Sequence, residues 1–503
     1  MNHSSATIEG CNLSNNIATT RGGAIWSDDD LYVYNSTFSG NNALANGGDD
    51  QNEGDGGAIH LDGGNANLFS VTITNNTSKD AGAIYVTAGA NLYIYGNEET
   101  NTTISGNTSS EHGGGGIVSN GNLSLNGDIS ITGNTCHTNG GGIWDNGTLY
   151  IVGNVQVKDN TGDDIFLKSG KVIDVSYGIT SGANSIGVRM EKPGVFTNGY
   201  GSGMGQEYDN PFFPNANNIV IEQDGECMLA YRYVTCSWED NQLVHTIDTT
   251  FEAVKLINAS STTLSGWNIA EGTFTVSDNV TCSGSEVHLI LMDGANITFE
   301  KGLDVPHSSH LYIHSQSYDS AMGKLYATGE DEAAGIGANK DHISGDITIH
   351  GGDITAQGGQ DGAGIGGGEG VSCGIINIYG GTIRATGGEY GAGIGDGELG
   401  IGTMIYQMFD PGHSITIYGG DIRAKGGTYG AGIGGYNLPT TSQVDKTIEI
   451  TIHDGQVSAI GGQYGAGIGG SQNGTVNCQL STSLRACMFC ISLTVTTLKP
   501  RKS

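Results

Sequence analysis

Aromatic residues recur at two outward positions of a segment that is repeated in the C-terminal half of the chain. One set is His350, Tyr379, Tyr418 and His453, and the second is Tyr390, Tyr429 and Tyr464. A tyrosine combines an apolar ring with a polar tip, so a column of such rings can stack against sugars. Rings on adjacent strands also stabilise a sheet by stacking on one another. The sequence leaves both interpretations open.

Two arginines, Arg384 and Arg423, share a further outward position of the same segment. Guanidinium groups bind carboxylates in a fixed, two-pronged geometry, so this pair is suited to an acidic sugar. Together with the aromatic columns, it makes a polysaccharide or a host or cell-surface glycan the predicted partner.

Acidic residues gather in a Gly-rich loop near the N-terminus, namely Asp49, Asp50, Glu53 and Asp55. Carboxylate and carbonyl oxygens are the ligands that Ca²⁺ prefers. Their spacing matches neither the EF-hand loop nor the nonapeptide calcium repeat. Calcium binding and simple solvation of loop acids therefore both remain open, and no other cofactor is predicted.

The segment "GAGIGG", which begins at Gly362, Gly430 and Gly465, fits the G-x-G-x-x-G nucleotide fingerprint in its letters. That fingerprint requires a helix whose N-terminus receives the pyrophosphate. Here each copy leads into another turn and strand, so nucleotide binding is excluded. We interpret the glycines as corners that adopt positive φ values, and Ile365 as the residue that reaches the core.

Charge and hydropathy exclude two further classes of protein. The chain has 52 acidic and 20 basic residues, and its net charge of −32 would repel a phosphate backbone. Nucleic acid is therefore not a predicted partner. No run of 18 apolar residues exists, so no transmembrane helix is predicted.

No catalytic residue is predicted. A β-helical glycosidase needs paired carboxylates on adjacent coils, and a lyase needs a positioned base. The nearest acidic pair is Asp163–Asp164, and it has no identifiable companion. Because the surface repeats while a catalytic site must be unique, we expect a non-catalytic protein. The alternatives are a polysaccharide lyase or glycosidase with its site in residues 171–262, and a passive surface spacer.

Internal repeats must position all of these residues. The N-terminal unit combines GGAI-like motifs with alternating strands and an apolar-x-x-Asn group. Its asparagines are predicted to stack at one corner as a side-chain amide ladder, and they are Asn41, Asn76, Asn107, Asn134 and Asn160. The C-terminal unit reads "ITIYGGDIRAKGGTYGAGIGG" from Ile415 and occurs in three close copies, from Ile347, Ile376 and Ile450.

Such repeats predict an all-β, right-handed parallel β-helix in two arrays with an irregular middle segment, because stacked coils share one core. In the copy from Ile415, alternation turns Ile415, Ile417, Ile422 and Ala424 inward. The predicted parts are a GGAI and apolar-x-x-Asn array (1–170), an irregular excursion or cap (171–262), a GAGIGG array (263–474) and an off-pattern tail (475–503).

Residues 8–160 resemble the repeats of chlamydial polymorphic outer-membrane proteins, whose hallmarks are GGA[I/L/V] and FxxN. Phe38 to Asn41 is a literal FxxN. Residues 263–474 are similar to the Gly-rich GAGIGGG arrays of gut-bacterial surface proteins. The first resemblance implies a β-helical adhesin displayed on a cell surface. We therefore expect a secreted or cell-surface, adhesin-like scaffold, although the N-terminus lacks a signal-peptide region and the chain looks truncated.

Overall fold

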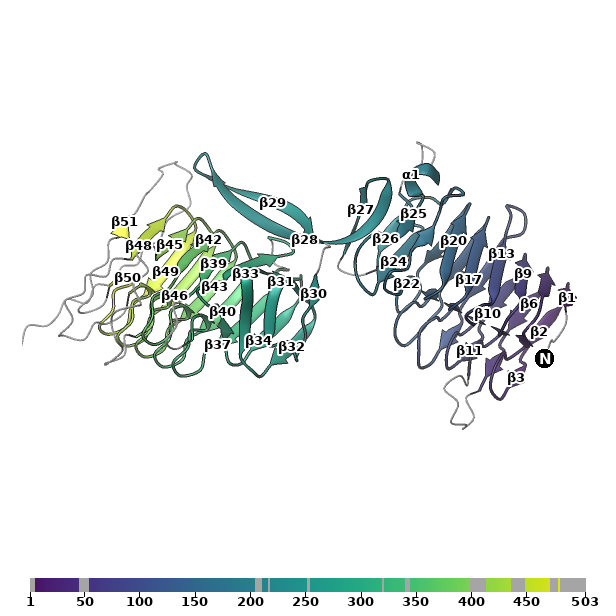
Figure 1. The fold of residues 1–503 in the computed structure, drawn as a ribbon, viewed down its shortest axis with the longest axis horizontal. Coiled ribbons are helices and arrows are strands. Elements are labelled where there is room, and N and C mark those ends of the chain that lie inside the picture. Colours follow the sequence, from purple (N-terminus) through teal and green to yellow (C-terminus); the bar gives the residue numbers. More distant parts are fainter. Residues whose placement is uncertain are drawn as a thin grey trace, which may run out of the picture. The chain divides into compact units, whose positions relative to one another are not determined.

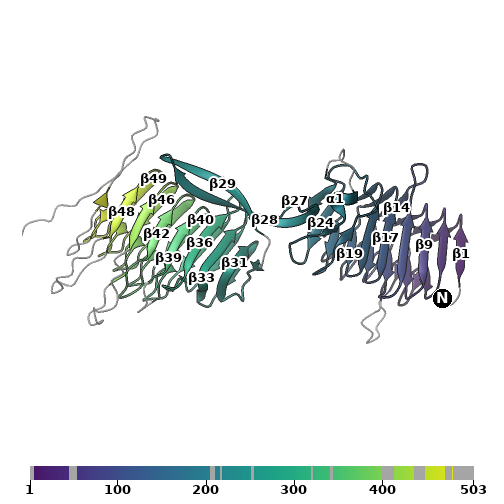
Figure 2. The same cartoon turned by 45° about the horizontal axis from the view of Figure 1, so that its top comes forward.

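The computed structural model describes residues 5–44, 54–203, 210–215, 218–250, 254–318, 321–339, 344–398, 413–435, 448–470 and 478–479. The chain divides into two compact units, Met1–Tyr231 (unit 1) and Arg232–Ser503 (unit 2). Apart from the short helix α1 (Tyr200–Gly203), every regular element of the described residues is a strand. In each unit, parallel strands stack coil upon coil (Figures 1 and 2), which confirms the prediction of a parallel β-helix.

The coils of unit 1 form three sheets, one of which is short. The first sheet contains β1 (Ala6–Glu9), β5 (Leu31–Tyr34), β9 (Asn65–Phe69), β13 (Asn91–Tyr95), β17 (Asn122–Asn126), β20 (Thr148–Val152), β23 (Ile173–Asp174) and β25 (Thr197–Asn198). The short sheet contains β3 (Ile17–Ala18), β7 (Asn42–Ala43), β11 (Thr77–Ser78) and β15 (Thr108–Ser109).

The remaining sheet of unit 1 has two branches that meet at β24 (Ile186–Met190), which also pairs with β26 (Phe212–Pro214). One branch contains β2 (Asn12–Ser14), β6 (Thr37–Ser39), β10 (Thr72–Thr74), β14 (Thr102–Ser105), β18 (Ile129–Thr132) and β21 (Val155–Lys158). The other contains β4 (Ile25–Ser27), β8 (Ile59–Leu61), β12 (Ile84–Val86), β16 (Ile117–Ser119), β19 (Ile143–Asp145) and β22 (Ile165–Leu167).

Unit 2 repeats this plan around the long strand β33 (Val280–Leu291). One branch contains β35 (Leu303–Asp304), β38 (Ile336–Gly337), β41 (Ile365–Gly366), β44 (Ile394–Gly395), β47 (Ile433–Gly434) and β50 (Ile468–Gly469). The other contains β36 (His310–Ser315), β39 (Asp346–Ile349), β42 (Ile375–Ile378), β45 (Ser414–Ile417), β48 (Glu449–Ile452) and β51 (Cys478–Gln479).

Strand β31 and a second, seven-stranded sheet complete the coils of unit 2. Strand β31 (Thr263–Ala270) pairs with β33 and with β30 (Lys255–Leu256). The second sheet contains β32 (Thr273–Val276), β34 (Asn296–Phe299), β37 (Lys324–Thr328), β40 (Asp353–Gln357), β43 (Thr382–Thr386), β46 (Asp421–Lys425) and β49 (Gln456–Ile460).

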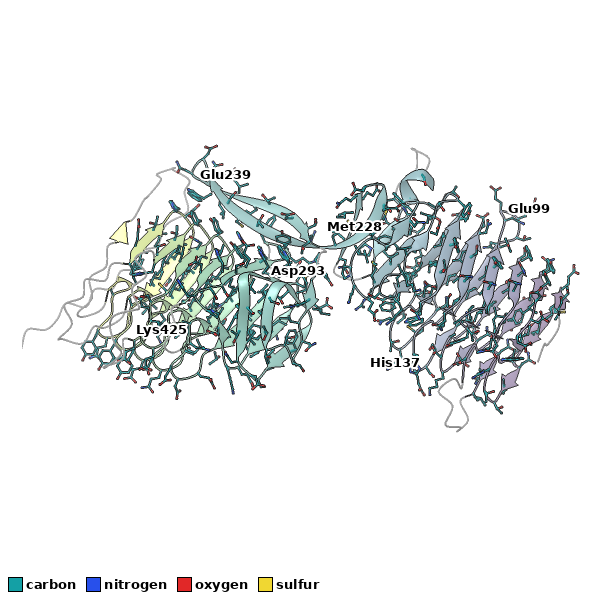
Figure 3. The ribbon with its side chains drawn as sticks, in the orientation of Figure 1. Glu99, His137, Met228, Glu239, Asp293 and Lys425 are labelled. Carbon is teal, nitrogen blue, oxygen red and sulfur yellow. The ribbon has the colours of Figure 1, made fainter. Side chains whose placement is uncertain are left out.

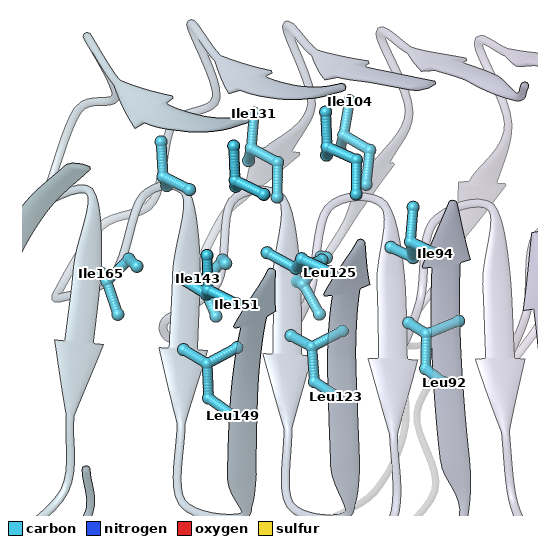
Figure 4. Close-up of a cluster of buried hydrophobic side chains, with 14 of the residues drawn as sticks. Leu92, Ile94, Ile104, Leu123, Leu125, Ile131, Ile143, Leu149, Ile151 and Ile165 are labelled. Atoms are coloured by element: carbon cyan, nitrogen blue, oxygen red, sulfur yellow. The ribbon is translucent and has the colours of Figure 1, made fainter. Parts of the chain in front are cut away.

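Alternation of apolar and polar residues builds both cores. In unit 1, Leu92, Leu123 and Leu149 are in register on successive strands and form one buried row (Figure 4). In unit 2, the four residues predicted to face inward, Ile415, Ile417, Ile422 and Ala424, are all buried, as predicted. Each coil is too small to exclude water alone, so the core exists only because neighbouring coils cover one another.

The corner glycines have two different roles. Gly366 has a φ of 131°, so the predicted positive φ is present there. Gly362 and Gly364 lack a positive φ, which corrects the prediction for them. A Cβ at Gly362 would lie 2.0 Å from the Ala333 oxygen, and one at Gly364 would lie 2.6 Å from the Gly393 oxygen. These glycines are therefore required because the backbones of adjacent coils touch, while Ile365 is buried in the core.

In the sequence between the coils of unit 1 and those of unit 2, the chain leaves the β-helix. Strands β27 (Ile219–Gln223), β28 (Glu226–Glu239) and β29 (Gln242–Thr250) form a three-stranded sheet, although β23–β25 upstream still belong to coils of unit 1. Asp240 and Asn241 join β28 to β29 with φ values of 49° and 60°, which is the geometry of a type I′ hairpin turn. Glu239 lies at the end of this hairpin (Figure 3).

Candidate carbohydrate-binding surfaces

The first predicted column of rings exists in unit 2. The ring centroids are 5.2 Å apart for His350 and Tyr379, 4.3 Å for Tyr379 and Tyr418, and 5.0 Å for Tyr418 and His453. Neighbouring ring planes differ by 17° or less, so each ring covers the face of the next. His314 extends the column, with its ring 5.0 Å from that of His350.

The hairpin β28–β29, which we call the strap, crosses this column. The Tyr233 ring lies 4.8 Å from that of His314, and the His314 Nδ1 lies 3.1 Å from the Val234 oxygen. Trp238 packs on Tyr418 and His453 at ring distances of 5.8 and 4.9 Å. The strap therefore covers part of this predicted column, and burial of apolar ring surface favours that arrangement.

A hydrogen bond to the strap holds the imidazole of His350 in its neutral form. The Cys236 backbone N–H donates to His350 Nδ1 at 2.9 Å, which requires an unprotonated nitrogen there. Burial lowers the pKa of His350 to about 4 and that of His314 to about 3. Both side chains are consequently uncharged at neutral pH and act as structural partners of the strap.

The second predicted column, Tyr390, Tyr429 and Tyr464, is more accessible. Adjacent ring centroids are 5.0 Å apart and the planes differ by 5° and 12°. Tyr464 is 38% exposed. Because the rings cover one another's faces, this column presents edges and hydroxyl groups to its surroundings. The predicted stacking of sugars on these faces is thus blocked, except at the two end rings, whereas hydrogen bonding to the hydroxyl row stays available.

The predicted arginine pair is already engaged with carboxylates. Arg384 and Arg423 are in register on adjacent strands, as the repeat predicted. The Arg384 Nη1 pairs with Asp353 Oδ1, and the Arg423 Nη2 lies 3.0 Å from Asp421 Oδ2. An acidic sugar would have to compete with these carboxylates, which weakens the prediction of an acidic-sugar contact.

The five predicted ladder asparagines form one hydrogen-bonded column in unit 1. Each Nδ2 donates to the Oδ1 of the next side chain, over 2.8 Å from Asn41 to Asn76 and 3.0 Å from Asn134 to Asn160. The column begins one coil earlier, at Asn16, and ends on Asp164, whose Oδ1 accepts from Asn160 at 2.9 Å. Four of the five, Asn41, Asn76, Asn107 and Asn134, are fully buried.

Both residues of the acidic pair Asp163–Asp164 contact other side chains of unit 1. Asp164 ends the amide ladder, and its Oδ2 also accepts from Asn215 Nδ2 at 2.8 Å. Asp163 Oδ1 lies 3.5 Å from Arg189 Nη1. Burial raises the pKa of Asp163, while Arg189 opposes that shift. Both carboxylates are thus engaged in contacts within the protein.

The candidate calcium loop lies mostly outside the described residues. This applies to Asp49, Asp50 and Glu53. The fourth residue, Asp55, is buried at a corner and forms parallel β-bridges with Arg21 and Asp80. Within the described ranges, no three His, Cys, Asp or Glu side chains gather to hold a metal ion. Calcium binding stays a prediction.

Sequence reasoning missed a third set of aromatic residues, on the outer face of the first sheet of unit 1. Tyr32, Tyr93 and Tyr150 are half-exposed and lie on β5, β13 and β20, which are alternate strands of that sheet. The signal was present in the sequence as "LYVY", "LYIY" and "LYIV", separated by repeats that lack the Leu-Tyr pair.

Two family models match the chain. The beta helix repeat matches residues 347–369, 376–398, 415–435 and 450–472. This part of unit 2 is therefore built from β-helix repeats. In unit 1, residues 10–28, 70–87 and 128–145 match the Chlamydia polymorphic membrane protein repeat, which confirms the predicted resemblance within residues 8–160. No curated protein and no solved structure matches this β-helix protein. No helix in its described part has the length and apolar character of a membrane span.

Proposed function

We propose that this β-helix protein is a non-catalytic, adhesin-like protein of the cell surface or extracellular space that contacts glycans through repeated rows of side chains. The single observation that carries the proposal is the accessible column Tyr390, Tyr429 and Tyr464. It aligns three phenolic hydroxyls at the coil spacing of about 5 Å. Regularly spaced hydroxyls suit a ligand that is itself a chain of hydroxyl-bearing units.

Two further observations support this function. Matches to the repeats of Chlamydia polymorphic membrane proteins favour a surface protein of the adhesin type. A tyrosine hydroxyl is protonated at neutral pH and keeps its donor hydrogen, and the neighbouring Glu389 carboxylate raises the pKa of Tyr390 further. The engaged acid pair Asp163–Asp164 favours a binding protein over a glycosidase.

The test is a glycan array probed with the wild type and with the triple variant Tyr390→Phe, Tyr429→Phe, Tyr464→Phe. Phenylalanine keeps the stacked rings and removes only three hydroxyls. If each hydroxyl contributes about 1 kcal/mol, the triple variant should bind roughly 100-fold more weakly. Tyr379→Phe, under the strap, is the matched control and should bind as the wild type does.

Unchanged binding in the triple variant would mean that the column only stabilises the sheet. The enzymatic alternative is tested separately, by incubating the protein with pectin, alginate and chondroitin. The appearance of unsaturated products would replace the adhesin proposal with a polysaccharide lyase.

A further inference from the structure

The first sheet of unit 1 differs from both ring columns of unit 2 in how its tyrosines are spaced. Register along the sheet pairs Tyr32 with Asn67, Asn67 with Tyr93, Tyr93 with Ser124, and Ser124 with Tyr150. A small polar side chain therefore separates each tyrosine from the next. Within the described residues, none of these three rings stacks on another aromatic ring, in contrast to Tyr390 and Tyr429.

This spacing has a length that a ligand can match. Neighbouring strands of a sheet lie about 4.8 Å apart, so tyrosines on alternate strands are about 9.5 Å apart. In an extended, ribbon-like polysaccharide, successive sugars turn over, and the same sugar face returns at every second unit. That repeat is close to the tyrosine spacing, whereas a ring on every strand would repeat at about half that length.

Two further columns border the tyrosines. On one side, the rings of Tyr34, Phe69 and Tyr95 stack at 4.9 and 4.5 Å and form an aromatic wall. On the other side runs a row of amides, in which Asn91 Nδ2 donates to Asn65 Oδ1 at 3.0 Å and Asn65 Nδ2 donates to Asp30 Oδ1 at 2.8 Å. The strip thus offers apolar ring surface beside hydrogen-bonding amides, which is the combination that a sugar ring presents in return.

The charge of the strip selects among glycans. Between Tyr32 and Tyr150, the residues in the column are Asn67, Tyr93 and Ser124, none of which carries a charge at neutral pH. The chain as a whole has a net charge of −32. A uronate or sulfated polymer would be repelled by that field without gaining a cationic partner on the strip.

We propose that Tyr32, Tyr93 and Tyr150, with Asn67 and Ser124 between them, form a platform for one extended, uncharged polysaccharide chain that lies across the strands of the first sheet. Every second sugar stacks on a tyrosine, and the intervening sugars contact Asn67 and Ser124. This inference rests on the proposed function for the class of ligand. It concerns a different unit and a different arrangement of rings, and it predicts that a Tyr→Phe change here leaves binding intact, whereas the same change in the hydroxyl row of unit 2 weakens it.

The experiment is calorimetric titration of the full chain with the uncharged oligosaccharides cellohexaose, xylohexaose and mannohexaose, and with polygalacturonate as the acidic probe. At least one uncharged hexasaccharide should bind, and its trisaccharide should bind more weakly because it reaches fewer tyrosines. Tyr93→Ala should weaken binding about tenfold, while Tyr93→Phe should stay within about twofold of the wild type, because the ring face is kept. His137→Ala, at an exposed position outside the first sheet, is the control.

The outcomes separate this platform from the hydroxyl row of unit 2. Binding that survives Tyr93→Ala, or tighter binding of polygalacturonate than of every uncharged hexasaccharide, overturns the platform. If glycans bind and only the Tyr390, Tyr429 and Tyr464 phenylalanine variant loses them, the proposed function stands and the platform does not. Absence of binding to every glycan overturns both.

Discussion

The coils of unit 1 are held together by side chains inside the β-helix, and those of unit 2 by side chains on its outer face. In unit 1, the repeated residue is an asparagine inside the corner, where Asn76, Asn107 and Asn134 are buried and hydrogen-bonded to one another. In unit 2, the repeated residues are rings outside the sheet, and the strap packs over them through Trp238 and Cys236. A repeated side chain can therefore fasten a solenoid from within by polar bonds or from outside by stacking.

The difference between the units follows from what each type of side chain needs. A buried amide must satisfy two donors and an acceptor, and only identical amides in adjacent coils supply partners at every step. A stack of rings on the outer face leaves its ring edges exposed, and burial of these edges is favourable where another segment can cover them. The first column of unit 2 obtains this cover from the strap, a segment far away in the sequence.

The largest expected effect is on the interior ladder. Asn107 accepts from Asn76 and donates to Asn134 and to the Ile73 carbonyl, so Asn107→Ala leaves several buried polar groups without partners. We expect unit 1 to lose more than about 3 kcal/mol of stability. Hydrogen exchange on the full chain should show faster exchange in unit 1 only, with the exposed Asn126→Ala as control. Equal exchange in the two variants would contradict a stabilising role for the ladder.

Low pH should destabilise unit 2 more than unit 1. Burial lowers the pKa of His314 to about 3 and of His350 to about 4, whereas a histidine of the unfolded chain has a pKa near 6.5. Between the folded and unfolded pKa values, the unfolded chain therefore binds more protons than the folded chain does. The stability that these histidines contribute is present above pH 6.5 and is lost as the pH falls toward 4, on the order of a few kcal/mol.

Unit 1 contains groups with opposite responses to acid. Burial raises the pKa of Asp145 to about 6, so this carboxyl favours folding increasingly as the pH falls from 6 toward 4, whereas burial lowers the pKa of His60 to about 4 and has the opposite effect. Hydrogen exchange at pH 7, 5.5 and 4 should therefore show greater loss of protection beneath the strap than in unit 1. Equal loss in both units would rule out the strap histidines as the cause.

A smaller effect is expected from the strap itself. Trp238→Ala removes the ring contacts with Tyr418 and His453, and we expect the strap to dock more weakly by about 1–2 kcal/mol. Exchange of the β29 amides should speed up while the coils beneath stay protected. Glu239→Ala, at the exposed end of the hairpin, is the control. Equal protection of β29 in both variants would show that the strap does not depend on this ring.

The smallest expected effect concerns a single buried carboxyl in unit 1. Asp145 is fully buried in a column that holds Ser119 on one side and Leu167 on the other, and its Oδ2 has no hydrogen-bond partner. Asp145→Asn removes the cost of a buried charge at neutral pH, and we expect a gain of about 1 kcal/mol or less. Chemical denaturation at pH 7 and pH 5 should show this gain only at pH 7. Asp62→Asn, at an exposed position, should change neither value.

Short-range patterns predicted much of this molecule. Alternation placed Ile415 and Ile417 inside and Tyr418 outside, and equal spacing put Tyr379 beside Tyr418 and Asn107 beside Asn134. These predictions rely on the period of a strand and on the stacking of equivalent residues, both of which are local properties. The reason for Gly362 was less accessible, because the backbone contact that excludes a Cβ belongs to the preceding coil.

The sequence by itself determined the coil, its inward and outward residues and the identity of its ladders, since each depends on residues that recur in register. Only the tertiary structure decided which outward rings are covered. The strap reaches His350 from 114 residues away, and no repeat encodes that contact. Likewise, register in the sheet decided that Asn67 and Ser124 lie between Tyr32, Tyr93 and Tyr150, so these rings do not stack on one another.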